Sequence, residues 1–239
     1  MDINDDGSFE VYLGGEPRDG NWLELPPGSA RVSSRHYFEL QQPAACQPDL
    51  EPRITIECIN ERAEPETVTD ARVASGMRRV ATFLRSRTLG MPPMAKARQP
   101  DFVSITPNQF PPPVLPGDFG AAAFDAHYSM APYFIGEDEA LVITGRWPQC
   151  LFANICLWNR FMQIYDYTTR QVSLNRVQTQ LEDDGSFRII LSHTDPGLPN
   201  WLDTEGRAFG IVYWRFFLVE GEVETPRAEV VKLSDLRRN

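Results

Sequence analysis

The chain has 239 residues, of which 42% are hydrophobic, and a formal net charge of −10 from 33 acidic and 23 basic residues. This length and composition fit one large β domain or two small ones, with an ordinary core. Nucleic-acid binding depends on clustered basic residues that contact phosphates. The acidic balance, with no basic run longer than a pair, therefore argues against a nucleic-acid partner.

The sequence also points away from a membrane or metalloprotein. No apolar stretch approaches the roughly 20 residues that a membrane-spanning helix needs, and the first six residues do not resemble a signal peptide. The cysteines show no Cys-x-x-Cys motif and no zinc-like spacing, so we expect structural thiols. We therefore expect a cytoplasmic protein with no membrane partner, no metal and no cofactor. The four cysteines are Cys46, Cys58, Cys150 and Cys156.

The chain nearly repeats itself from end to end. The sequence DDGSF at residues 5–9 recurs at residues 183–187, and NWL at residues 21–23 recurs at residues 200–202. The distance along the chain between the two DDGSF copies and that between the two NWL copies differ by a single residue. An aromatic strand-like run follows each NWL. Two similar β-units far apart in sequence indicate a two-sheet or two-lobe β architecture.

The repeated pentapeptide predicts a hairpin turn. A three-residue loop at residues 183–185 requires a left-handed conformation at its last position, so we predict a positive φ at Gly185. With this loop, one apolar face runs across both strands at period two. The expected cross-strand pairs are Leu181–Phe187, Thr179–Ile189 and Val177–Leu191.

The first copy begins differently, because only four residues precede its turn at residues 5–7. The strand at residues 9–13 then has no full-length partner from its own hairpin. Unpaired strand edges are commonly covered by another element or chain. We expect a distant segment of the chain, or a second subunit in isologous contact, to pair with this edge, which would make the protein a homo-oligomer in the second case.

A helix interrupts the β pattern at residues 67–88. There Val73, Met77, Val80 and Leu84 recur at three- and four-residue steps, which is typical of one amphipathic helix. Thr67 and Asp70 are spaced as a capping box. Five arginines decorate the other faces of this helix, either as a solvated surface or, less simply, as a ligand surface.

The remaining segments divide the chain into four parts. Residues 1–60 form a first β-unit, residues 61–90 the helical excursion, residues 91–120 a Pro-rich connector and residues 121–239 the main β-block, within one compact domain. Missing amide donors make the connector an extended surface crossing or a lid. Strands are expected at residues 8–13, 30–40, 53–60, 140–147, 151–158, 171–181, 187–192, 211–219 and 229–233.

Candidate site residues lie between residues 154 and 215, where aromatic side chains adjoin amides, hydroxyls and charges. Such mixtures line sites for polyhydroxylated or carboxylated small molecules. An arginine would hold a carboxylate or hydroxyl array and a tryptophan would stack, while a histidine with an aspartate would transfer protons. The candidates are Arg170, Asn175 and Trp201 for ligand binding and His193 and Asp195 for catalysis.

The same residues also have structural interpretations. Asparagines near strand ends often cap turns, and Asp195 begins an Asp-Pro-Gly turn signal. Trp201 has a counterpart, Trp22, in the first copy, which favours a shared packing role. The three histidines, His36, His127 and His193, come from distant segments without metal-ligand spacing. No serine lies in a nucleophile elbow, and no glycine-rich nucleotide loop is present.

A family resemblance follows from several motifs in order. The run YTTRQVSLN at residues 167–175, the DDG turn, DPGLPNWLD at residues 195–203 and the segment from residues 220 to 233 are similar to the bacterial family of domain of unknown function 1214. The resemblance implies a jelly-roll-like β-sandwich without an established activity. Longer members carry residues before the first hairpin, so the chain is either a short natural form or lacks that upstream part.

Taken together, the sequence predicts a mainly β protein, a jelly-roll-like β-sandwich with two similar β-hairpin units and one helix. We expect its second half to bind or act on a small oxygen-rich ligand. The alternative is a non-catalytic interaction module that uses an exposed sheet edge. A cleft joining His193, Asp195 and Arg170 would support the first hypothesis, whereas side chains pointing apart would support the second.

Overall fold

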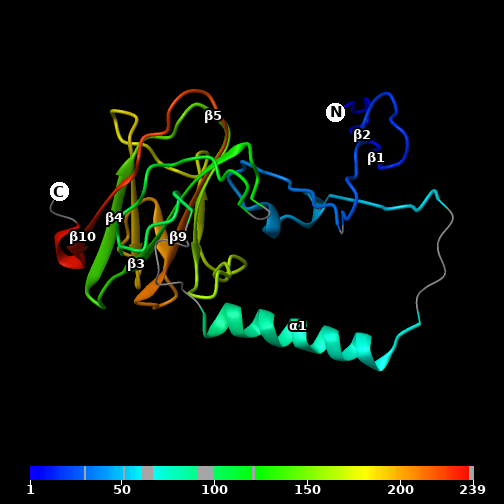
Figure 1. Ribbon diagram of the computed structural model, residues 1–239. Helices are drawn as coiled ribbons and strands as arrows, with labels where there is room; N and C mark the ends of the chain where they lie inside the picture. Colours follow the sequence, from blue (N-terminus) through cyan, green and yellow to red (C-terminus); the bar gives the residue numbers. More distant parts are fainter. Residues whose placement is uncertain (30, 51, 61–66, 91–99, 120–121, 237–239) are drawn as a thin grey trace. The chain divides into compact units, whose positions relative to one another are not determined.

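Two four-stranded sheets form the body of the protein in the computed structural model, which describes residues 1–29, 31–50, 52–60, 67–90, 100–119 and 122–236 (Figure 1). The first sheet is antiparallel, in the order β3 (Ala126–Phe134), β9 (Phe209–Val219), β5 (Cys150–Trp158) and β6 (Ser173–Asn175). The second has the order β10 (Arg227–Lys232), β4 (Glu139–Gly145), β7 (Phe187–Ser192) and β8 (Trp201–Asp203), with β7 and β8 parallel. The protein is thus mainly β, as predicted.

The main core lies between these two sheets. Strand alternation sends Leu141 and Ile189 inward from one sheet, and Ile155 and Trp214 inward from the other. All four are fully buried, and each such side chain contributes about 1.5–3 kcal/mol of transfer free energy. The two inner faces therefore hold each other together as a β-sandwich.

The Pro-rich connector pairs along β3 at the edge of the first sheet and packs on the outer face of that sheet. Its described part, residues 100–119, forms β-bridges from Val103 to Met130 and from Val114 to Tyr128 on β3. The Ser129 hydroxyl donates a hydrogen bond to the Pro111 carbonyl oxygen. The connector is therefore an extended crossing along β3 over this part. Residues 91–99 and 120 of the expected segment lie outside the described residues.

The predicted helix is α1 (Asp70–Thr88), coloured cyan to green in Figure 1. Its N-cap is Thr69, whose Oγ1 accepts a hydrogen bond from the Arg72 N–H at 3.3 Å, so the expected cap at Thr67 is wrong. Thr69 has extended backbone dihedrals, which place the first helical turn after it. None of the helices in the described ranges combines the length and apolar character needed to cross a bilayer.

The second DDGSF copy forms the predicted turn but a shorter hairpin than expected. Gly185 has φ +80°, and Leu181 pairs with Phe187 as an isolated bridge, which confirms both predictions. The two further pairs are wrong, because β6 ends at Asn175 and a turn follows. Instead β7 pairs with β4 on one side and with β8 on the other.

The first copy repeats this arrangement inside the unit Met1–Tyr37, which is described by itself. Here β1 (Tyr12–Leu13) and β2 (Trp22–Leu23) pair in parallel, as do β7 and β8. Gly7 has φ +81°, and the indole N–H of Trp22 donates to the Gly14 carbonyl, as that of Trp201 donates to the Ser192 carbonyl. The sequence repeat is therefore a structural repeat.

Other expected strands are absent from the described chain. Residues 31–40 and 53–60 form no strand, and the expected strand at residues 8–13 contracts to β1, because a strand needs a hydrogen-bonded neighbour and only β2 supplies one. The prediction also missed β3 and the short β8. Cys150 and Cys156 are free thiols on an unbroken β5, as expected.

Candidate functional site

The loops after β7 and β8 bring several of the candidate residues together. His193 follows β7, and its Nδ1 lies 2.6 Å from the hydroxyl of Thr204, which follows β8. Thr204 is fully buried, and its N–H donates to the Ser192 carbonyl. The imidazole is therefore held by a buried hydroxyl on the neighbouring loop.

Arg170 lies beside the same loop. Its Nη1 donates to Asp203 Oδ2 at 2.6 Å, and this hydrogen bond raises the pKa of the Arg170 guanidinium. Asp203 is buried, and its Oδ1 accepts from the Glu205 N–H. Arg170 thus anchors the end of β8, while 46% of its side chain remains exposed.

Trp201 stands two residues before Asp203 on β8, so both side chains lie on the same face of the second sheet. The partly exposed indole donates its N–H to the Ser192 carbonyl at 3.3 Å. Gln171 donates from Nε2 to the Trp201 carbonyl. Trp201 therefore begins β8 and bonds the last residue of β7, while Arg170 and His193 lie at the other end of β8.

Asp166 organises the loop that leads into Arg170. Its carboxylate accepts hydrogen bonds from the Thr168 N–H and from the hydroxyls of Thr168 and Thr169, which hold its pKa below the ordinary value. Its N–H donates to Glu205 Oε1 at 2.6 Å. The loop therefore forms an internal polar network with the residues after β8.

The expected pairing of His193 with Asp195 is not formed as a direct hydrogen bond. Asp195 Oδ1 accepts instead from the Gly197 N–H at 2.7 Å, which closes the Asp-Pro-Gly turn. His193 is bonded to Thr204 through Nδ1. The Asp195 carboxylate therefore bonds within its own turn, and the two side chains have different hydrogen-bond partners.

Asn175 lies on the other sheet, away from these residues in the topology. Its Oδ1 accepts from the Gln178 N–H, and its Nδ2 donates to the Leu40 carbonyl. Next to it Arg176 pairs with Glu39 in a partly buried salt bridge. Asn175 therefore ties the segment at residues 38–40 to β6.

Three polar residues, Tyr133, Tyr165 and Arg207, form contacts that were not predicted from the sequence. Tyr133 and Tyr165 share a hydroxyl–hydroxyl hydrogen bond of 2.7 Å in the core, and burial raises the pKa of both phenols. Arg207 stacks over the Tyr165 ring at 5.4 Å. These residues lie far apart in sequence, and no local motif signals their contact.

The polar-aromatic mixture of β5 and β9 is a second core rather than a concave site. Trp158 and Tyr213 stack with ring centroids 4.4 Å apart, and the Arg215 guanidinium lies 5.3 Å from the Tyr213 ring. These side chains share the outer face with Tyr128 and Cys156, whose thiol has its pKa raised to about 11 by burial. Phe102 and Val114 of the connector pack in the same cluster.

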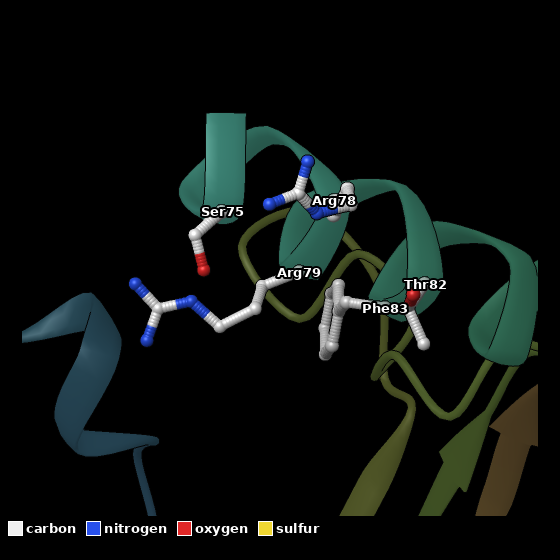
Figure 2. A pocket seen from close by; sticks show the side chains of 5 residues that line it. All are labelled: Ser75, Arg78, Arg79, Thr82 and Phe83. Atoms are coloured by element: carbon white, nitrogen blue, oxygen red, sulfur yellow. The ribbon is translucent and has the colours of Figure 1, made fainter. Parts of the chain in front are cut away.

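Two surface hollows avoid the candidate residues. Ser75, Arg79 and Phe83 project from successive turns of α1 beside the first, and Figure 2 shows that every lining residue belongs to that one helix. The second lies between residues 108–110 and residues 224–228. In the described part of the chain, no group of three His, Cys, Asp or Glu side chains could hold a metal ion.

Two solved structures are similar to the chain, and the first of them supports the fold. A crystal structure of an uncharacterised protein from Burkholderia cenocepacia matches with 26% identity and a TM-score of 0.73, over 99% of this chain and 63% of that one. A protein from Vibrio parahaemolyticus matches with 14% identity and a TM-score of 0.41, over 71% of this chain and 47% of that one. The chain thus spans less than two thirds of either protein's length.

No curated protein matches the chain. A family model described as "Protein of unknown function (DUF1214)" matches residues 1–40 and residues 150–219. These two segments contain both copies of the DDGSF turn and both copies of NWL. The chain is therefore a β-sandwich protein that resembles the DUF1214 family over both halves of its internal repeat.

Proposed function

We propose that the chain is a non-catalytic interaction module that binds a partner polypeptide along an edge of the unit Met1–Tyr37. One observation carries the proposal. Phe9, Val11 and Leu13 are 45%, 40% and 38% exposed. Their counterparts in the second copy, in the same order, are 1%, 0% and 0% exposed. These counterparts are Phe187, Ile189 and Leu191.

The backbone of the same segment is also available. Tyr12 and Gly14 donate their N–H groups to the carbonyls of Asn21 and Leu23, toward β2. Because backbone groups alternate along a strand, Val11 and Leu13 direct theirs to the opposite side. We call this side of residues 9–13 the open edge; within the described chain, no strand pairs with it. Such edges template strand addition.

The test combines capture with a footprint on the full chain. The wild type should retain a polypeptide from extracts of its source cells, and binding should slow hydrogen exchange at the amides of Val11 and Leu13. Val11→Asp should abolish retention, because a carboxylate on the apolar face would lose its water on binding. Val177→Asp, at another exposed valine, is the matched control and should retain the partner. Equal retention by Val11→Asp, or a footprint elsewhere, contradicts the proposal.

A second candidate function is binding of a small oxygen-rich ligand, carbohydrate-like or carboxylated, at the β7–β8 end. The observation that favours it is that Arg170 bonds Asp203 through Nη1 and remains partly exposed. Of the Arg170 side chain, 46% is exposed, and Trp201 on β8 is also partly exposed. In this proposal Arg170 would hold the ligand's oxygens, Trp201 would stack, and His193 would supply any proton transfer.

Arginine substitution tests this second candidate. Arg170→Gln should abolish chemical-shift changes produced by a panel of sugars and small carboxylates. Arg146→Gln is the matched control, because Arg146 is 49% exposed and likewise pairs with an aspartate, Asp184. A panel that shifts no resonance of the wild type, or shifts both variants equally, contradicts ligand binding at Arg170.

A further inference from the structure

We propose that the open edge binds an extended strand that runs antiparallel to residues 9–13 and carries the pattern apolar-x-apolar-cation-glycine. This inference rests on the proposed function, because it takes the open edge as the binding surface. The second copy supplies the template: there β4 pairs antiparallel with β7 along the equivalent edge. A partner strand in the same place would complete the first copy as β4 completes the second.

The two apolar positions follow from the register of β4 on β7. Leu141 lies opposite Leu191 and Ile143 opposite Ile189, and all four side chains are fully buried in the main core. In the first copy, Leu13 and Val11 occupy the places of Leu191 and Ile189. The partner therefore needs an apolar side chain opposite each, two residues apart on one face.

The glycine follows from a close contact in the template. Gly145 lies opposite Phe187, and a Cβ on Gly145 would lie 2.9 Å from Phe187 Cζ, too near for two carbon atoms. The phenyl ring therefore occupies the space above the glycine backbone, as aromatic residues do across strands. Phe9 holds the place of Phe187 in the first copy. The partner residue opposite Phe9 is accordingly glycine.

The cation follows from a difference between the copies. In the second copy Arg188 lies opposite the neutral Thr144. The first copy has an exposed Glu10 at the place of Arg188. Since opposite charges on facing residues stabilise a strand pair and like charges destabilise it, the partner carries lysine or arginine opposite Glu10.

A second copy of this chain meets these requirements only in part. Antiparallel pairing of two open edges about Tyr12 would place Leu13 opposite Val11 and Gly15 opposite Phe9, but Gly14 opposite Glu10. The strand would then offer no cation to Glu10, and pairing would join two chains that each carry a net charge of −10. The partner is thus a different segment of polypeptide.

A designed peptide tests the pattern on the full chain. The probe has the sequence of residues 137–147 with Thr144→Lys, which reads Leu-Val-Ile-Lys-Gly at its centre. We expect it to bind and to slow exchange of the Val11 and Leu13 amides at least tenfold. The amides of Tyr12 and Gly14 already bond β2 and serve as the internal reference. Unchanged exchange along β7 shows that the peptide has not displaced β4.

Variants of the probe separate the outcomes. The same peptide with Gly145→Val should bind at least tenfold more weakly, and one with Thr144→Glu at least threefold more weakly. Equal binding by the Gly145→Val peptide, no binding by any peptide, or protection of the open edge by self-association alone overturns the inferred pattern. If the cellular partner still footprints Val11 and Leu13, the proposed function stands without this pattern. If Val11→Asp changes neither cellular capture nor peptide binding, both fail.

Discussion

The side-chain amide of Asn200 forms two hydrogen bonds with the backbone of Gln180, as the backbone of a neighbouring strand would. Asn200 Oδ1 accepts from the Gln180 N–H at 2.8 Å, and Asn200 Nδ2 donates to the Gln180 carbonyl at 2.7 Å. Asn21 makes the same two bonds to the backbone of Asp2 at 2.6 and 2.7 Å. The asparagine of each NWL motif thus extends its hairpin where backbone pairing stops.

Replacing this asparagine should be costly. Asn200 is buried, its Nδ2 also donates to the Arg188 carbonyl, and its φ is +57°. Asn200→Ala leaves backbone groups without partners in a strained conformation, and we expect a loss of about 2–4 kcal/mol in the free energy of unfolding.

Asn200→Gly is the matched control in the same denaturant titration, because glycine accepts positive φ but makes no side-chain bonds. Its loss should be smaller than that of alanine by about 1 kcal/mol, the cost of the left-handed conformation. Equal losses would show that backbone strain contributes nothing at this position.

The turn glycine gives a second prediction. Gly185 has φ +80°, and a Cβ there would meet only Arg146 Nη1, at 3.4 Å. The cost of a side chain is therefore mainly conformational. Gly185→Val should lower the free energy of unfolding by about 1–2 kcal/mol. Gly185→Asn should cost less, because asparagine tolerates this region; a reversed order in chemical denaturation would contradict the assignment.

A double-mutant cycle tests the role of His193. Because Nδ1 contacts the buried Thr204 hydroxyl, we expect His193→Ala and Thr204→Val each to destabilise the fold, with a coupling energy of about 0.5–1.5 kcal/mol. His193→Ala with an unchanged melting temperature and abolished ligand binding would instead assign the histidine to a binding site. Additive losses would show that the two side chains do not interact in solution.

Much of the fold was predictable because its signals are local. The turn at Gly185 follows from its DDG sequence, and the helix from the spacing of Val73, Met77, Val80 and Leu84. The long hairpin expected around this turn does not form, because β7 pairs with residues 139–145 and 201–203 instead. Sequence periodicity identifies a strand but does not show which of several strands will pair with it. The strands expected at residues 30–40 and 53–60 have strand-like composition but no neighbour in the described chain.

The candidate site was less predictable than the fold. Composition located Arg170, His193 and Trp201, and all three lie on or beside the pair of β7 and β8. Composition could not show that Asp203 bonds Arg170 or that Thr204 bonds His193, because those contacts depend on tertiary pairing. Asp195 and Asn175 carry ordinary turn and capping signals, and their side chains make the bonds that those signals indicate.

The Asp166 loop makes the stability of the fold depend on pH in the acid range. Hydrogen bonds from Thr168 and Thr169 lower the pKa of the Asp166 carboxyl in the folded state. Its contribution is therefore complete above the unfolded pKa of about 3.9 and is lost as the pH falls through the lower folded value. Thr168→Ala should raise the Asp166 pKa in an NMR titration and flatten this acid dependence, whereas Thr168→Ser, which keeps the hydroxyl, should not. An Asp166 pKa that is the same in all three proteins would show that the threonine does not stabilise the carboxylate.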